Sequence, residues 1–349
     1  MVHARGNDAI PVVPVGGFLG AGKTTLLNHL LRNNRGIKIG VVVNDFGSIN
    51  IDSMMVAGQV DSMVTLGNGC LCCAVDADEM DAMLDTLAGA PSRLDVIVVE
   101  ASGLAEPRNL IRMVLASNNP AITYGGLVTV VDAVEFFSTR SAHPEIEQHL
   151  RLADLLVLNK TDRLAQHDID AVTAELRRCA PDIPVQATDH GRVDAELLFD
   201  VPEYLDDPSV ARQLSFDEIL YAADDHHAHL HVGYSTTTFE TCEPMDPRRF
   251  VEVLENPTGE VYRLKGFVLF GIDGYPGRYE VSTVGTHIRM KRTEVEFADA
   301  VGTQLVVIGT KIDDELIEVR LLDCVRRPGD ATDESAMMPV HRYVPGIAR

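Results

Sequence analysis

Short apolar runs alternate with amphipathic segments along residues 10–205. The runs are continuous in Val, Ile and Leu, as expected of parallel strands that are buried on both faces. Several segments between them have apolar residues at helical spacing. The alternation predicts a doubly wound, mostly parallel α/β domain, and the glycine spacing of residues 17–24 after the first strand is typical of a P-loop fold. The predicted strands are 10–15, 37–43, 96–99, 127–131, 155–158 and 183–185, and the predicted helices are 24–32, 78–87, 146–153 and 168–179. Pro14 lies inside the first strand, where we expect a local bend or bulge.

The pattern changes beyond about residue 230, where strand-like segments outnumber helical ones. This part predicts a smaller α+β domain with a largely antiparallel sheet. Its predicted strands are 232–240, 261–270, 279–284, 304–309 and 316–322, with a helix at 247–254. The predicted organisation is a flexible N-terminus at 1–9, the α/β domain at 10–205, an acidic linker with His at 206–229, an α+β domain at 230–327 and a loosely held tail at 328–349.

The 349-residue chain is strongly acidic, with 30 Lys and Arg against 52 Asp and Glu and a formal net charge of -22. A nucleic-acid backbone would be repelled by this charge, so we expect no nucleic-acid partner. The chain has no apolar run long enough to span a membrane and no secretory pattern at its start. We therefore expect a cytoplasmic protein, and the sequence leaves its self-association open.

A phosphate-binding loop is predicted between the first strand and the first helix. Residues 17–24 have the spacing Gly-x-x-x-x-Gly-Lys-Thr. The glycines let backbone amides approach phosphate oxygens, and the helix N-terminus favours an anion. Lys23 can reach the β- and γ-phosphates, and the Thr24 hydroxyl can ligate Mg²⁺. The alternative is a chance glycine-rich turn, which the strand–loop–helix order disfavours. The predicted nucleotide contacts here are Gly17, Gly20, Ala21, Gly22, Lys23, Thr24 and Thr25.

A guanine-binding motif, Asn-Lys-x-Asp, follows the strand at 155–158. The Asp162 carboxylate can accept two hydrogen bonds, from N1–H and the N2 amine of guanine, and adenine offers no such pair of donors. Asn159 can bind the base edge, and the Lys160 stem can pack on the ring. The motif therefore predicts that the nucleotide is GTP or GDP.

Two acidic residues follow predicted strands at the same edge of the sheet. Glu100 can hold the hydration shell of Mg²⁺ or orient the attacking water, although a surface carboxylate is the alternative. Asp45 lies in a candidate switch segment, and Gly103 can let the backbone move when the γ-phosphate leaves. We predict a GTPase with Lys23, Asp45 and Glu100 as catalytic residues. A P-loop kinase would lack an acceptor site and leave the guanine motif unexplained.

A cysteine cluster, Cys70, Cys72 and Cys73, lies between the second strand and the strand that ends at Glu100. Thiolates bind Zn²⁺, Co²⁺ and similar ions, and three sulfurs leave a fourth position vacant. A vacant position suits a metal that is later handed on. Buried small hydrophobic residues and a redox pair are the alternatives. The other cysteines are expected in the core; they are Cys179, Cys242 and Cys324.

A histidine-rich run in the linker is a second candidate metal site. It comprises Asp224, Asp225, His226, His227, His229 and His231. Histidine clusters bind Zn²⁺, Ni²⁺ and Co²⁺, but a solvated linker with incidental histidines explains the run equally well.

Together these motifs resemble the CobW-like metallochaperone GTPases. The matching segments are 17–25, 44–52, 70–73, 100–107, 129–133 and 159–162. The resemblance implies a GTPase whose nucleotide state is coupled to a metal held by the three clustered cysteines and delivered to a client metalloprotein. Clients in the family include zinc enzymes, cobalamin synthesis and nitrile hydratase maturation. The alternative is a nucleotide-gated activator of a partner enzyme with a purely structural metal. This chain has Asp45 where the family usually has Glu, and Ser48 where it often has another acid.

Overall fold

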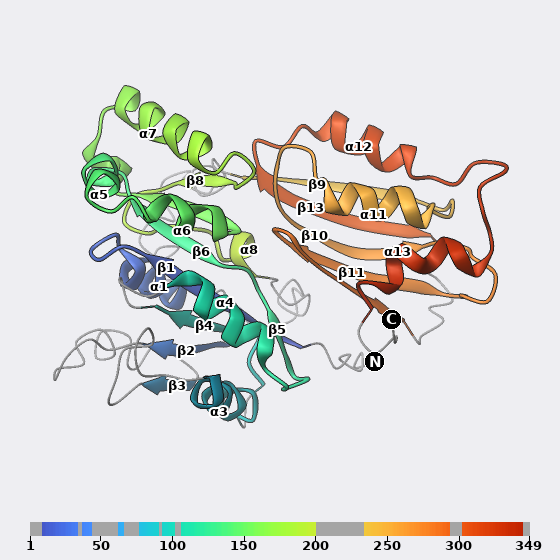
Figure 1. Cartoon of the computed structure of the whole chain (residues 1–349), viewed down its shortest axis with the longest axis horizontal. Helices are drawn as coiled ribbons and strands as arrows, with labels where there is room; N and C mark the ends of the chain where they lie inside the picture. Colours follow the sequence, from blue (N-terminus) through green and yellow to red (C-terminus); the bar gives the residue numbers. More distant parts are fainter. Residues whose placement is uncertain are drawn as a thin grey trace, which may run out of the picture. The chain divides into compact units, whose positions relative to one another are not determined.

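The computed structural model describes residues 9–33, 37–43, 62–65, 77–90, 93–101, 106–199, 234–293 and 302–344. The chain separates into two compact units, Met1–Val232 and Gly233–Arg349 (Figure 1). The first unit is an α/β fold and the second is an α+β fold, which confirms the predicted fold class. No helix in these described ranges is both long and apolar enough to cross a membrane.

The sheet of the first unit is parallel in every strand pair described, and its order is β3-β2-β4-β1-β6-β7-β8, with β5 also paired to β1. The chain winds away from β1 in both directions, with β4 on one side and β6 on the other. A crevice for ligands forms at the carboxyl ends of strands at such a point. The strands are β1 (Ile10–Gly17), β2 (Ile39–Val43), β3 (Ser62–Thr65), β4 (Val96–Glu100), β5 (Ile122–Tyr124), β6 (Val128–Asp132), β7 (Leu155–Asn159) and β8 (Val185–Ala187).

Helices cover both faces of this sheet. Ile97 and Val99 of β4 pack in the cluster formed with α3 and α4, whereas the adjacent Glu100 contacts α1. Successive strand residues point to opposite faces, so α1 lies across the sheet from α3 and α4. The helices are α1 (Lys23–Arg32), α3 (Ala77–Ala88), α4 (Pro107–Ala116), α5 (Phe136–Ala142), α6 (Ile146–Leu152), η1 (Thr161–Arg163), α7 (Gln166–Cys179) and α8 (Ala195–Leu198).

Pro14 sits within β1 without the expected bulge, because the register with β4 is continuous from Val12 to Val15. Ala101 donates its amide to the Val15 carbonyl, so the backbone polar groups of Val15 point toward β4. Those of the adjacent Pro14 therefore point toward the opposite edge of β1. On that side, β5 pairs with residues 10–12 and β6 with residues 15–17. The missing amide donor of Pro14 therefore falls where β1 changes partner.

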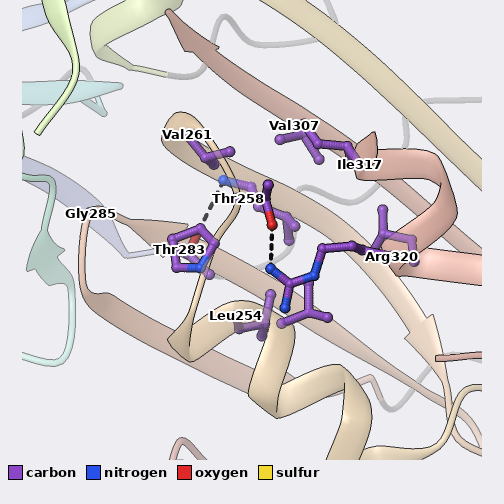
Figure 2. Close-up of a pocket in the computed structure, with 12 residues that line it drawn as sticks. Leu254, Thr258, Val261, Thr283, Gly285, Val307, Ile317 and Arg320 are labelled. Carbon is purple, nitrogen blue, oxygen red and sulfur yellow. Dashed lines mark hydrogen bonds between the residues drawn. The ribbon is translucent and has the colours of Figure 1, made fainter. Parts of the chain in front are cut away.

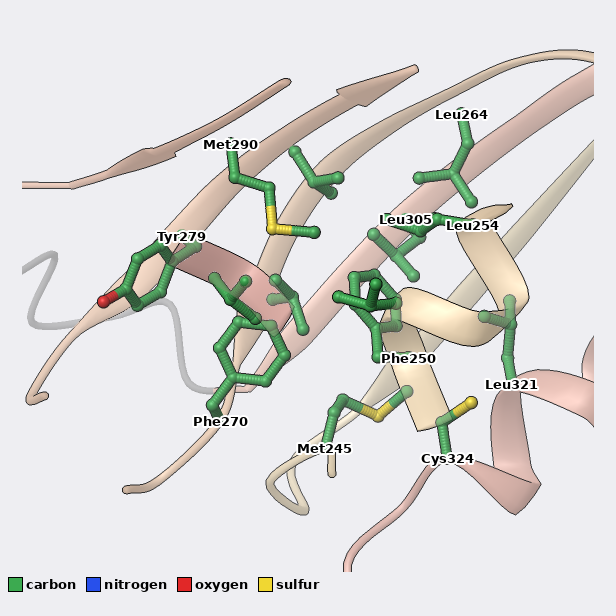
Figure 3. Packing of buried hydrophobic residues seen from close by; sticks show 14 of the residues in the cluster. Met245, Phe250, Leu254, Leu264, Phe270, Tyr279, Met290, Leu305, Leu321 and Cys324 are labelled. Carbon is green, nitrogen blue, oxygen red and sulfur yellow. The ribbon is translucent and has the colours of Figure 1, made fainter. Parts of the chain in front are cut away.

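The second unit is an antiparallel sheet of order β12-β11-β10-β13-β9 with helices packed on it. Its core is rich in aromatic rings: Phe250 lies 5.8 Å from Phe270, which lies 5.5 Å from Tyr279 between ring centroids (Figure 3). The strands are β9 (Ser235–Thr241), β10 (Glu260–Leu269), β11 (Arg278–Val284), β12 (His287–Arg292) and β13 (Thr303–Thr310), and the helices are α11 (Pro247–Glu255), α12 (Asp314–Asp323), η3 (Glu334–Met337) and α13 (Met338–His341).

The segment predicted as a strand at 316–322 is helical, and that prediction was wrong. It forms most of α12, whose start is capped by the Asp313 side chain accepting from the Leu316 amide. The helix buries Ile317 and Leu321 but also carries exposed apolar residues. Because it is apolar on several sides, its sequence lacks a one-sided helical pattern.

The segment after Arg327, which we expected to be loosely held, packs onto the second unit over residues 328–344. Met337 and Val340 are fully buried in its core, and α13 packs against α11. Asp330 also forms an ion pair with Arg249 of α11, with 2.7 Å between Oδ2 and Nη2. The buried residues belong to a short apolar run at 336–340, which follows the mostly polar, Pro- and Gly-containing residues 328–335 on which the prediction depended.

Candidate nucleotide site

The predicted phosphate loop connects β1 to α1 at the carboxyl edge of the parallel sheet (Figure 1). Its three glycines have left-handed backbone conformations, with φ of 134° at Gly17, 78° at Gly20 and 107° at Gly22. Gly22 caps the N-terminus of α1, whose first amides point out of the helix. The loop therefore has the open backbone and helix end that an anionic ligand needs.

Two of these glycines are also required by close approach to neighbouring strands. A Cβ on Gly17 would lie 2.3 Å from the Val130 carbonyl oxygen of β6. A Cβ on Gly22 would lie 2.2 Å from Asn159 Nδ2 at the end of β7. At Gly20 nothing lies within 4 Å, so only its backbone conformation favours glycine. The loop is thus held tightly at both ends and open in its middle.

Lys23 begins α1 and is only 7% exposed. Its Nζ donates to the carbonyl oxygens of Gly17 and Phe18, at 3.0 and 3.2 Å. These bonds fold the Lys23 side chain back over the loop and hold its ammonium against the loop backbone. The ammonium is therefore close to the segment that would receive phosphates. Thr25, two residues further along, is exposed.

Thr24 and Glu100 meet across α1 and β4. The Thr24 hydroxyl donates to Glu100 Oε1 at 2.7 Å, and the Glu100 side chain is almost fully buried. Glu100 is the last residue of β4, next to β1 in the sheet. A hydroxyl beside a carboxylate supplies the hard oxygen donors that Mg²⁺ prefers, so this pair fits a magnesium site.

Asn159 links the guanine motif to the phosphate loop. Its Nδ2 donates to the Ala21 carbonyl at 3.0 Å, and its Oδ1 accepts from the Gly191 amide at 2.9 Å. Both polar groups of this buried side chain bind protein backbone, so Asn159 holds two loops together. Its Nδ2 carries a second N–H, and the predicted contact with the base edge stays a prediction.

The other two residues of the motif differ in environment. The Lys160 ammonium lies 2.5 Å from Asp132 Oδ2 at the end of β6. Asp162 lies in η1 and is exposed, so its carboxylate is accessible to a ligand. The guanine motif therefore exposes the Asp162 carboxylate to solvent, while its lysine, Lys160, is paired with Asp132 outside the motif.

Sequence reasoning missed the loop at residues 188–192. Gly191 packs so closely on α1 that a Cβ there would lie 2.6 Å from the Leu26 amide nitrogen. Thr188 accepts from both the amide and the hydroxyl of Thr161, at 3.2 and 2.8 Å. The 188–192 loop thus contacts both α1, which follows the phosphate loop, and Thr161 of the guanine motif. The available clue was a turn-forming run, Asp189 to Gly191, four residues after the end of the last predicted parallel strand.

Several predicted site residues lie outside the described residues. They are Asp45, Gly103, Cys70, Cys72, Cys73, His226, His227, His229 and His231. Within the described ranges, three or more metal-ligating side chains do not gather at any point. Cys179 and Cys324 are buried as predicted, and burial raises the pKa of the Cys324 thiol to about 12. Cys242 is exposed, so its assignment to the core was wrong.

A small cavity of about 40 Å³ lies in the second unit beneath α11 and α12 (Figure 2). Its lining is mostly apolar, and Arg320 lies at its side, where it donates to the Asn256 carbonyl and to Thr258. Ligand pockets for molecules of drug size occupy roughly 300 Å³ or more. This cavity is therefore a packing gap and does not compete with the nucleotide site.

Comparisons with known proteins support both units. The CobW/HypB/UreG nucleotide-binding domain matches residues 11–187, and the cobalamin synthesis protein cobW C-terminal domain matches residues 234–325. The zinc chaperone CobW of Sinorhizobium sp. is 33% identical over 90% of this chain and 97% of its own length. The zinc chaperone YjiA of Escherichia coli (strain K12) is 30% identical over 78% and 85%. The crystal structure of Zn(II)-bound YjiA GTPase from E. coli aligns with a TM-score of 0.43 at 23% identity, covering 91% of this chain and 100% of that one.

Proposed function

The chain belongs to the CobW family, and on that premise we propose that it is a cytoplasmic GTP-hydrolysing metallochaperone. It binds a transition metal, Zn²⁺ or a similar ion, and delivers it to a client metalloprotein in a nucleotide-dependent way. The observation that carries the GTPase part is the convergence of Lys23, the Thr24–Glu100 pair and Asn159 on one phosphate loop.

The phosphate loop binds the triphosphate of GTP. Backbone amides between Gly17 and Thr25 donate to phosphate oxygens, helped by the positive end of α1. Lys23 turns from the loop carbonyls to the β- and γ-phosphates. The tight packing of Gly22 on Asn159 supports this role, because it fixes the loop against the base-binding side.

Thr24 and Glu100 hold Mg²⁺, with the Thr24 hydroxyl as a ligand and Glu100 fixing bound water. When bound, Mg²⁺ neutralises the charge that develops on the phosphates. Glu100 is well suited to orient water because its side chain is buried and held by Thr24. Asp45 and Gly103, which lie outside the described residues, are proposed to respond to the γ-phosphate.

The guanine motif selects the base. The exposed Asp162 carboxylate accepts the two hydrogen bonds offered by guanine, and the Lys160 stem packs on the ring. Asn159 acts indirectly, through the bonds by which it joins the phosphate loop to the 188–192 loop.

The transported metal is bound by the thiolates of Cys70, Cys72 and Cys73. Support comes from the clustering of these residues in sequence and from the relatives, both of which are described as zinc chaperones. Three thiolates bind Zn²⁺ firmly and leave one position for an acceptor ligand of the client.

The test measures Zn²⁺ affinity by chelator competition with a non-hydrolysable GTP analogue and with GDP. We expect the two nucleotide states to differ in affinity, and equal values would contradict coupling. A triple Cys→Ser variant should lose Zn²⁺ but stay folded and hydrolyse GTP. Unfolding of that variant would favour the alternative function, a nucleotide-gated activator with a structural metal.

A further inference from the structure

Asp132 is the last residue of β6, beside Asn159 in the β6–β7 ladder. Its Oδ1 accepts from the amides of Val134 and Glu135 at 3.0 and 3.3 Å, and its Oδ2 lies 2.5 Å from Lys160 Nζ. Both oxygens are therefore engaged, and the carboxylate has one defined orientation. The side chain is 14% exposed, so the ion pair is shielded more than a surface pair.

Lys160 contacts one carboxylate, that of Asp132, and lies two positions before another, that of Asp162. Asp132 is fixed by backbone amides, whereas Asp162 follows two positions later in η1 and is exposed. Asp162 forms no ion pair with any described residue, and the Lys160 ammonium pairs with Asp132. Lys160 itself has a left-handed backbone, with φ of 65°, which directs its side chain differently from a helical residue.

We propose that Asp132 is a positioning residue that sets guanine specificity by holding the Lys160 ammonium away from Asp162. The inference rests on the proposed binding of GTP and deepens it. Asp162 must keep its lone pairs for N1–H and the N2 amine of guanine. An ammonium bound to Asp162 would compete for those lone pairs. In this proposal the flexible Lys160 stem, two positions before Asp162 in the chain, turns to that carboxylate once Asp132 is neutral. When Asp132 is charged, it holds the Lys160 ammonium, and this ammonium no longer competes with guanine for Asp162.

The experiment compares GTP with inosine triphosphate, which lacks the N2 amine, by calorimetric titration of the full-length protein. Asp132→Asn keeps an oxygen for the Val134 and Glu135 amides, removes the charge and replaces the oxygen that accepts from Lys160 with an amide NH2, which cannot accept. We expect this variant to lose about threefold to tenfold of the preference for GTP, as befits a partly shielded charge pair. Lys160→Met, which keeps an apolar stem, should weaken both nucleotides alike and retain the preference.

The double variant decides between positioning and a merely structural role. If Asp132 acts through Lys160, then Asp132→Asn has no further effect on the preference in the Lys160→Met background. An effect that persists there, or an equal loss of both nucleotides in Asp132→Asn, would overturn the inference. If Asp132→Asn does not fold, loss of the preference in Lys160→Met alone overturns it. A wild-type protein that binds no GTP would instead refute the proposed function and the inference with it.

Discussion

Gly22 of the phosphate loop lies directly against Asn159 of the guanine motif, so that a methyl group on Gly22 would be 2.2 Å from Asn159 Nδ2. Residues far apart in the sequence are thereby locked together. The same asparagine amide donates to the Ala21 carbonyl one residue earlier. Disturbing either residue should therefore affect phosphate binding and base binding together.

Gly22→Ala should destabilise the protein more than Gly20→Ala. Both positions have left-handed backbones, so each substitution costs about 1 kcal/mol in strain. Only Gly22 adds a clash with Asn159, because nothing lies within 4 Å of a Cβ on Gly20. Urea unfolding of the two variants measures the difference, with GTP titration alongside. Equal destabilisation would show that the contact with Asn159 relaxes without cost.

Asn159→Ala and Asp162→Ala should separate stability from base recognition. Asn159→Ala leaves the Ala21 carbonyl and the Gly191 amide without their partner and should cost roughly 3 kcal/mol of unfolding free energy. Asp162 is exposed, so its removal should leave stability nearly unchanged and abolish the preference for GTP over ATP. Chemical denaturation and competitive nucleotide binding provide the two measurements. A stable Asn159→Ala variant would argue against the bridge.

Thr24→Val should reduce GTP hydrolysis roughly hundredfold, equivalent to about 2.7 kcal/mol in the barrier. The change keeps the volume but removes the hydroxyl that donates to Glu100 and is proposed to ligate Mg²⁺. The decisive measurement is kcat across a Mg²⁺ titration. Thr86→Val, at an exposed threonine of α3, is the matched control and should behave as the wild type. Unchanged magnesium dependence in Thr24→Val would exclude Thr24 as a ligand.

The ion pair between Asp330 and Arg249 should make the second unit sensitive to acid. Hydrogen bonds from Arg249 and from the Arg327 amide lower the pKa of Asp330 from 3.8 to about 2. A carboxyl whose pKa is lower in the folded state stabilises the fold above its unfolded pKa. That contribution is therefore present above about pH 4 and is lost as the pH falls toward 2. Thermal unfolding from pH 5 to 2 should show a shallower decline in Asp330→Asn than in the wild type, and parallel curves would refute the assignment.

The parts of the site that depend on local spacing could be predicted from the sequence. The loop from Gly17 to Thr24 and the acid at Glu100 were found because glycine spacing and strand ends are visible in the chain itself. The bridging role of Asn159 was not, because it depends on Gly191, which only the fold brings near.

Two segments of the second unit differ from prediction, the first for a local reason and the second because of tertiary packing. Helix α12 was read as a strand because a short apolar run fits both structures, although Asp313 and the acidic residues after it form a recognisable helix start. Met337 and Val340 lie in a short apolar run after the mostly polar residues 330–335, and only the second unit's core explains their burial.

Gly191 packs against the backbone of Leu26 in α1, although most of the first unit lies between them in the sequence. During synthesis on the ribosome, the contacts of Gly191 with α1 and with Asn159 cannot form until this late loop has emerged. These contacts join residues far apart in the sequence and form only after the last parallel strand is made, and contacts of this kind slow folding. An N-terminal fragment that ends before residue 188 would consequently lack the Gly191 amide that binds Asn159. We expect such a fragment to bind guanine nucleotides poorly.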